Sequence, residues 1–280
     1  MDVKSLLFKV PDMTEQEHLN FYGLLLSIIE ELGTQAKNEY LASAFSVVDP
    51  SQLTTTNKET FYDFVITPPS FEDMVKKVGI LSQEKRLFVY SRIYAVISTG
   101  ALNEKKELVL SKVRTHLAVS REDDIKIRKE LSEVRNKISP LREGIKGAAK
   151  GVAVGGGVVG TVSVGIASNA LLFAGPPGWI LRGLIGIIGI IGYILGLRHG
   201  KRKAEETKKE IERRAQEVIR RLQETINHLT ERMGELEKRL HEAKWYKEQH
   251  ERIKQRINEL LATKHIVEQA ADLLIKGEEG

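Results

Sequence analysis

The spacing of apolar residues divides the chain into three regions of different character. Up to about residue 140, stretches with helical spacing alternate with polar turns. Residues 151–197 are almost wholly apolar, and after residue 204 apolar positions recur every three or four residues among Lys, Arg and Glu. We therefore predict an all-α protein with an N-terminal helical bundle (1–140), a Gly-rich transmembrane helical hairpin (141–203) and a long C-terminal coiled-coil helix (204–280).

The N-terminal region, roughly 14–135, is predicted to form a compact set of short helices. The expected helices span residues 19–33, 38–48, two segments within 70–100, 103–117 and 120–139. Ser82 is the expected N-cap of the second helix within 70–100, with Lys85 instead of Glu at the third helical position. Asn103 and Ser120 are the expected N-caps of the next two helices, and Pro140 marks the end of the region.

The middle region has no acidic residue from Gly144 to Ala204, and Arg182 is the single charge between Gly151 and Leu197. Its sequence GPPG, which contains Pro176 and Pro177, predicts a tight reversal. The two segments on either side, 151–174 and 179–197, each approach the roughly 20 apolar residues that a membrane-spanning helix needs. Trp179 and Arg182 stand beside the turn, at the expected depth of the membrane interface.

Basic residues flank this predicted membrane hairpin on both sides. They are Lys146 and Lys150 before it, and Arg198, Lys201, Arg202 and Lys203 after it. By the positive-inside rule, both termini are expected in the cytoplasm, with the hairpin in the inner (cytoplasmic) membrane. Glycines recur every four residues at Gly151 and Gly155, at Gly156 and Gly160, and at Gly192 and Gly196, and every three at Gly183, Gly186, Gly189 and Gly192. Such spacing lets helix backbones approach closely in a lipid environment.

Two other interpretations of the glycine-rich segment differ in how well they fit. Gly155, Gly157 and Gly160 spell the dinucleotide fingerprint G-x-G-x-x-G, but the first acid that follows is Glu205, so the residue that would bind the ribose is missing. A soluble protein with a buried apolar hairpin, stored and released later as in helical pore-forming toxins, stays an alternative. Glycines destabilise helices in water. In a bilayer, a backbone without hydrogen bonds costs so much free energy that the segment stays helical, so the many glycines favour the membrane location.

The C-terminal region carries the heptad pattern of a coiled coil. The predicted core residues are Ile211, Val218, Leu222, Leu229, Leu236, Leu240, Ile257 and Leu260. A single helix cannot bury this stripe, so it must pair with another copy, fold back on itself or pack on the N-terminal region. The pattern loses phase around 241–250, which is where a bend is expected. Homo-oligomerisation through this region is the interpretation that we prefer.

Composition narrows the classes of function. The net charge of +5 arises in the middle third, so neither end of the chain is basic enough to predict a nucleic-acid surface. The absence of Cys excludes disulfides and thiolate metal sites. No zinc-protease, nucleophile-elbow or phosphate-loop motif is present, so we expect no enzymatic activity, no cofactor and no small-molecule substrate.

Two stretches, 28–45 and 95–113, repeat a helix, a glycine, a polar turn with Asn and Glu, and another helix. With 81–120, this doubled pattern resembles the TerB-like domain, an all-α module of tellurite-resistance systems. In that family the turn carries acids that can bind a metal ion. Here the equivalent turn reads STG (98–100) and lacks the aspartate, although Glu30, Glu31, Glu104 and Glu107 stand nearby in sequence. Helix capping and a solvated surface are their plainest roles.

The resemblance implies sensing or scaffolding in bacterial stress and phage-defence systems, with a protein partner on the TerB-like domain. Combined with the membrane hairpin, it predicts a membrane-anchored sensor, scaffold or effector that oligomerises and disturbs the bilayer when activated. One alternative is a soluble pore-forming protein that inserts residues 151–197. Another is a coiled-coil protein that organises or shapes membranes.

Overall fold

The computed structural model describes residues 10–33, 37–98, 102–137, 204–239 and 244–276. Within these ranges the chain is helical and contains no strand. The elements are α2 (Glu15–Leu32), α3 (Lys37–Phe45), the 3-10 turn η2 (Pro50–Gln52), α4 (Thr55–Ile66), α5 (Phe71–Gly79), α6 (Gln83–Ile97), α7 (Glu104–His116), α8 (Arg121–Lys137), α11 (Ala204–Arg239) and α12 (Lys244–Lys276). The all-α prediction is therefore confirmed for the described residues.

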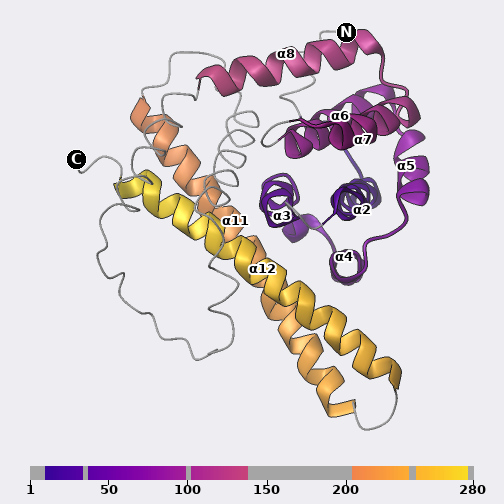
Figure 1. The fold of residues 1–280 in the computed structure, drawn as a ribbon, viewed down its shortest axis with the longest axis vertical. Helices are drawn as coiled ribbons and strands as arrows, with labels where there is room; N and C mark the ends of the chain where they lie inside the picture. Colours follow the sequence, from indigo (N-terminus) through magenta and orange to yellow (C-terminus); the bar gives the residue numbers. More distant parts are fainter. Residues whose placement is uncertain (1–9, 34–36, 99–101, 138–203, 240–243, 277–280) are drawn as a thin grey trace.

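Helix α2 is the centre of the N-terminal bundle, which comprises α2 to α8 (Figure 1). It is apolar on most of its surface and contacts α3, α4, α5 and α7. Its buried side chains include Leu19, Phe21, Tyr22, Leu24, Leu25, Leu26, Ile28 and Ile29. A helix that is apolar on nearly every side must be surrounded by other helices. Gly23 allows α5 to approach α2 closely, because a Cβ at this position would lie 2.8 Å from Met74 Sδ.

The N-caps predicted at Ser82, Asn103 and Ser120 are confirmed, whereas α2 begins at Glu15, before the expected start at residue 19. The Ser82 hydroxyl accepts a hydrogen bond from the Lys85 amide, and the Asn103 side chain accepts one from the Lys106 amide. The Ser120 hydroxyl accepts one from the Asp123 amide at 3.0 Å and donates one to the Asp123 carboxylate at 2.7 Å. Each of these side chains satisfies a backbone donor that the first turn of a helix leaves unpaired.

Helix α4 lies in a stretch to which the sequence pattern assigned no element. Its first turns, TTNKE, are polar, and only Phe61, Tyr62 and Val65 in its second half are buried. The apolar spacing is therefore too short to reveal a helical period. The aromatic contacts of Phe61 with Tyr22 and Phe45 hold this helix against α2 and α3.

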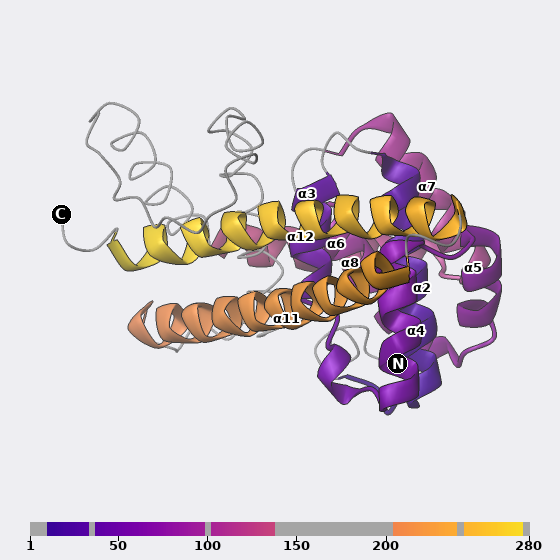
Figure 2. The ribbon, with the colours of Figure 1, turned by 90° about the horizontal axis from the view of Figure 1, so that it is seen from below.

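The C-terminal region differs from the single long helix expected. It consists of two helices, α11 and α12, which run antiparallel and lie side by side in both views (Figures 1 and 2). The division falls between Arg239 and Lys244, next to the loss of heptad phase around 241–250. A continuous helix would have turned the second apolar stripe away from the first, whereas a reversal lets the two stripes face each other. We call this pair the C-terminal hairpin.

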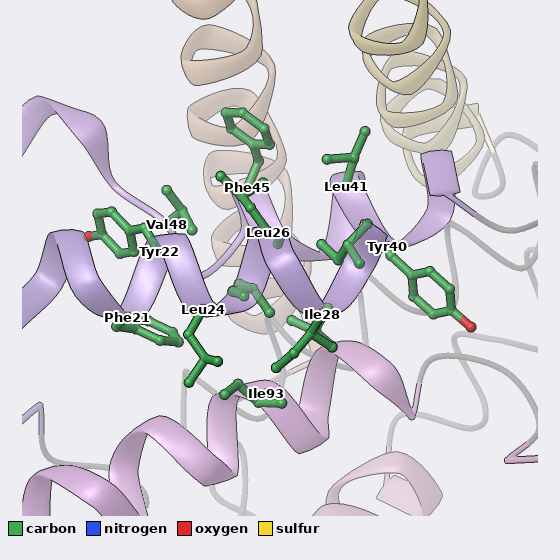
Figure 3. Packing of buried hydrophobic residues seen from close by; sticks show 14 of the residues in the cluster. Phe21, Tyr22, Leu24, Leu26, Ile28, Tyr40, Leu41, Phe45, Val48 and Ile93 are labelled. Carbon is green, nitrogen blue, oxygen red and sulfur yellow. The ribbon is translucent and has the colours of Figure 1, made fainter. Parts of the chain in front are cut away.

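The C-terminal hairpin packs on the N-terminal bundle through α3 and α4. Figure 3 shows Leu41 and Phe45 on the side of α3 that faces the two C-terminal helices. One continuous cluster of buried apolar residues includes these side chains together with Val218, Leu222 and Leu260 of the hairpin. Of the three partners considered for the heptad stripe, the structure thus combines folding back with packing on the N-terminal region.

Among the helices that the structure describes, none is long and apolar enough to cross a membrane. The predicted membrane hairpin, 141–203, falls outside the described ranges. That prediction therefore stays a prediction.

Candidate functional interface

The predicted coiled-coil core is buried where its side chains are described. Val218, Leu222, Leu229 and Leu260 are almost fully buried, Ile257 is 8% exposed, and Leu236 is partly buried against the same cluster. The side chain of Ile211 and the whole of Leu240 lie outside the described residues. The stripe is thus buried within one chain. A second copy could use the same residues only by displacing one of these contacts.

A partly buried polar network holds α8, the helix that precedes the apolar segment 151–197. The Tyr90 hydroxyl of α6 donates a hydrogen bond to Asp124 Oδ1 at 2.7 Å. Arg128 Nε donates to the same oxygen at 2.9 Å, and the guanidinium forms a bidentate pair with Glu107 of α7 at 2.8 and 3.0 Å. The Arg128 guanidinium also lies 5.0 Å from the centroid of the Tyr94 ring. We call Tyr90, Glu107, Asp124 and Arg128 the α8 network.

The electrostatics of the α8 network favour its hydrogen-bonded form. Burial raises the pKa of Tyr90, and the adjacent Asp124 carboxylate raises it further, so the phenol stays a donor. The hydrogen bonds to Glu107 raise the pKa of Arg128 against the opposing effect of burial. Ile127 and Leu131 on the same helix are fully or nearly fully buried. Polar and apolar contacts together therefore hold α8 on α6 and α7.

Arg221 of α11 is the central polar contact between the C-terminal hairpin and the bundle. Its guanidinium donates to the backbone oxygens of Val48 at 3.0 Å and Phe45 at 3.3 Å, and to Asp49 Oδ2 at 2.9 Å. The residue is only 8% exposed. Helix α3 has no basic residue in its own last turn. Arg221 therefore supplies further donors, and a positive charge that α3 lacks in its own last turn, to the carboxyl end of this helix.

Asp49 connects this contact to the interior of the bundle. Its carboxylate accepts a hydrogen bond from the Ser51 amide and so caps η2. Its own amide donates to the Tyr22 hydroxyl at 3.2 Å. Burial raises the pKa of Tyr22 to about 12, which keeps this hydroxyl neutral. One short segment after α3 thus joins α2, η2 and α11.

A second cluster of charged side chains lies at the carboxyl end of α2. Lys37 of α3 lies 2.9 Å from Glu30 Oε2, and Arg256 of α12 lies 3.5 Å from the same atom. Both cations also pair with Glu259 of α12, at 3.4 and 2.7 Å. Burial acts to raise the pKa of Glu30, but the hydrogen bonds and charges of Lys37 and Arg256 outweigh it, so the pKa lies below its ordinary value of 4.5. These cations offset an acid at the negative end of a helix dipole.

A third set of contacts joins α11 to α4. The His228 ring stacks on the Tyr62 ring, with centroids 4.0 Å apart and an interplanar angle of 20°. His228 Nε2 lies 3.2 Å from Glu59 Oε2. One turn further, Arg232 Nη1 donates to Asp63 Oδ1 at 2.6 Å. Asp63 and Arg232 are about half and one third exposed, so this pair lies at the rim.

The charges across this contact, which we call the hairpin interface, are distributed unevenly. The bundle contributes mainly acids and the hairpin mainly bases. The acids are Glu30, Asp49, Glu59 and Asp63, and the bases are Arg221, His228, Arg232 and Arg256. The pair between Lys37 and Glu259 has the opposite sense. Complementary charge of this kind fixes register and makes docking sensitive to salt.

These polar residues were not predicted from the sequence, although their spacing carries a signal. Arg221, Thr225, His228 and Arg232 follow one another at intervals of four, three and four, beside the apolar stripe. This spacing places them on one side of α11. A polar stripe with the same period as the apolar one indicates a second partner, which here is the bundle.

The acids singled out by the TerB-like resemblance have other partners here. Glu30 pairs with Lys37 and Arg256, Glu31 lies 3.1 Å from Lys112 Nζ, and Glu107 pairs with Arg128. Glu104 lies exposed in the first turn of α7. Within the described ranges, no group of three His, Asp or Glu residues has the geometry of a metal site.

The residues predicted to enter the membrane all fall outside the described part of the chain. They are Gly151, Gly155, Gly160, Pro176, Pro177, Trp179, Arg182, Gly186, Gly189 and Gly192, with the flanking Lys146, Lys150, Arg198, Lys201, Arg202 and Lys203. The described helices on either side of this region are α8 and α11. In Figure 1 the end of α8 and the start of α11 both lie toward the left of the molecule.

Comparisons of the chain with protein-family models, with curated proteins and with solved structures find no match. The interpretation of the interface therefore depends on its own geometry.

Proposed function

We propose that this protein is a membrane-anchored sensor, scaffold or effector of a bacterial stress or phage-defence system. In this proposal a TerB-like N-terminal domain binds a protein partner in the cytoplasm. Residues 141–203 form a hairpin in the inner membrane, and both termini stay in the cytoplasm. The C-terminal helices mediate homo-oligomerisation, and the activated assembly disturbs the bilayer.

The observation that carries the membrane assignment is the acid-free apolar segment between two basic flanks. The arrangement of the described helices supports it. A membrane hairpin must leave and re-enter the cytoplasm on one face of the bilayer, so its flanking helices must point to one side. The end of α8 and the start of α11, which both lie toward the left in Figure 1, are consistent with this requirement.

Carbonate extraction of membranes tests integral anchoring. We expect the full-length chain to stay in the membrane pellet, and release into the supernatant would contradict the proposal. Replacing Lys201, Arg202 and Lys203 by Glu should disturb the topology, because the positive charges hold that flank in the cytoplasm. Substituting Gly183, Gly186 and Gly189 by Leu should impair assembly if close helix packing depends on them.

A second candidate function is a pore-forming protein that starts soluble and inserts residues 151–197. The docking of α11 on the bundle favours this candidate, since α11 begins soon after the apolar segment and is held against α3 of the bundle. Purified soluble protein added to dye-loaded liposomes distinguishes the two. Rapid leakage supports insertion from the soluble state, whereas carbonate-resistant protein without leakage supports permanent anchoring.

A further inference from the structure

We infer that the C-terminal hairpin is a releasable arm, whereas α8 is a fixed part of the bundle. The two helices that flank the apolar segment are therefore held unequally. Release of the arm changes the position of α11 relative to α8, and so changes how the two ends of that segment are arranged. The docked structure is the closed form of this device.

The hairpin can leave the bundle without losing its own structure. Helices α11 and α12 contact each other more extensively than either contacts α3 or α4. Two of their buried polar side chains are satisfied within their own helices. The Thr225 hydroxyl donates to the Arg221 carbonyl, and the Thr263 hydroxyl donates to the Glu259 carbonyl. These groups need no partner from the bundle.

Arg221 makes docking of the arm and folding of α3 interdependent. When the arm is docked, its guanidinium bonds the carbonyls of Phe45 and Val48. When the arm leaves, these carbonyls lose the Arg221 guanidinium, and α3 has no basic residue of its own in its last turn, so the end of the helix is weakened. A change in the position of α11 therefore changes the stability of the carboxyl end of α3 in the bundle.

The docked state also leaves Arg221 imperfectly satisfied. Its Nε is buried and donates no hydrogen bond within the described part of the chain. A buried guanidinium with an unused donor contributes less to binding than a fully bonded one. The cross-interface pairs at α4 are partly exposed, where ion pairs contribute little. The main cost of release therefore lies in the buried contacts of Lys37 and Arg256 and in the apolar contacts with α3.

The consequence for the apolar segment rests on the proposed function, because it requires that segment to lie in the bilayer. The release of the arm from the bundle does not depend on the proposed function. Docking can therefore be tested by hydrogen exchange independently of carbonate extraction, and either experiment can fail while the other succeeds.

Hydrogen-exchange mass spectrometry on the full-length chain tests the inference. In Arg221→Met we expect amide exchange at the end of α3, residues 41–48, to rise about tenfold. Exchange in α8 and within the α11–α12 pair should stay unchanged. The matched control is Arg220→Met, since Arg220 is exposed and pairs only with Glu224 among the described residues. The control should leave α3 unchanged.

A charge exchange at the rim provides a second variant with little risk to folding. Asp63→Arg places two cations opposite each other and should raise α3 exchange, whereas Asp63→Arg with Arg232→Asp should restore it. The inference is overturned if α3 exchange is unchanged in Arg221→Met. It is equally overturned if α3 and α8 accelerate by the same factor, because the hairpin and bundle would then open as one unit.

Discussion

The two helices that flank the apolar segment are held by different kinds of contact. Helix α8 is held by a shared carboxylate, Asp124, that accepts hydrogen bonds from Tyr90 and Arg128, and by a bidentate pair to Glu107. Helix α11 is held by Arg221, which is buried at the end of α3, by buried apolar residues such as Val218 and Leu222, and by partly exposed pairs at α4. The first arrangement links elements close in sequence, and the second links residues more than 160 positions apart.

This difference indicates which part of the molecule can move. Bidentate and buried hydrogen bonds combine energy with fixed geometry, so they suit a rigid attachment. Exposed pairs between distant segments are screened by salt and contribute little individually. In the device that we infer, the apolar segment has a fixed entry at α8 and a releasable exit at α11.

The largest predicted effect concerns the fixed side. Asp124→Ala leaves the Tyr90 hydroxyl and Arg128 Nε without their acceptor, so we expect the free energy of unfolding to fall by about 3 kcal/mol. Urea denaturation followed by circular dichroism measures it. Glu122→Ala is the matched control on the same helix, because Glu122 is exposed and pairs only with Lys126 among the described residues. Equal losses in the two variants would contradict the role given to the α8 network.

The next effect concerns acid release of the arm. Because the pKa of Glu30 is lowered in the folded protein, its contribution is present above its ordinary pKa of 4.5 and is lost as the pH falls through the folded value. Energy transfer between dyes on α4 and α11 should therefore decrease below pH 4.5. Glu30→Gln should weaken this dependence on pH.

Glu17→Gln is the control for the acid experiment. Burial acts to raise the pKa of Glu17, but the hydrogen bonds from Lys85 and the Thr14 amide outweigh it, so the pKa of Glu17 is lowered as well. Glu17 lies at the start of α2, within the bundle, and makes none of the contacts of the hairpin interface. If Glu17→Gln removed the energy-transfer change as fully as Glu30→Gln, acid would be loosening the bundle and not the interface.

The smallest effect is expected at the rim. A double-mutant cycle of Asp63→Ala and Arg232→Ala should give a coupling of about 0.5 kcal/mol, as is typical of partly exposed pairs. A cycle of Tyr90→Phe and Asp124→Asn in the α8 network should give a larger coupling. The comparison between the two helices fails if the rim pair has the stronger coupling.

Local sequence rules predicted the N-terminal bundle well. The caps at Ser82, Asn103 and Ser120 depend on neighbours three residues away, so the sequence contains all the information needed. Helix α4 was not predicted because its buried residues are confined to about one and a half turns near Phe61 and Tyr62. The position of the reversal near 240 was indicated by the loss of heptad phase.

The hairpin interface could not be predicted in the same way. The contacts of Arg221 with Val48 and Asp49 depend on where the hairpin docks, which no local rule determines. The polar stripe on α11 shows that a second partner exists, but not which one. A heptad pattern likewise leaves open whether the stripe is buried by the same chain or by another copy.

The unequal attachment of α8 and α11 is tested most directly by two distances measured from one reference point. The chain contains no Cys, so spin labels can be placed at Thr56 of α4 with either Gln216 of α11 or Ser132 of α8, all exposed. Raising the salt concentration shortens the screening length to about 3 Å at 1 M. We predict that the distance between residues 56 and 216 then shifts to longer values while that between residues 56 and 132 stays constant. Two distances that both stay constant, or that change together, would contradict the account.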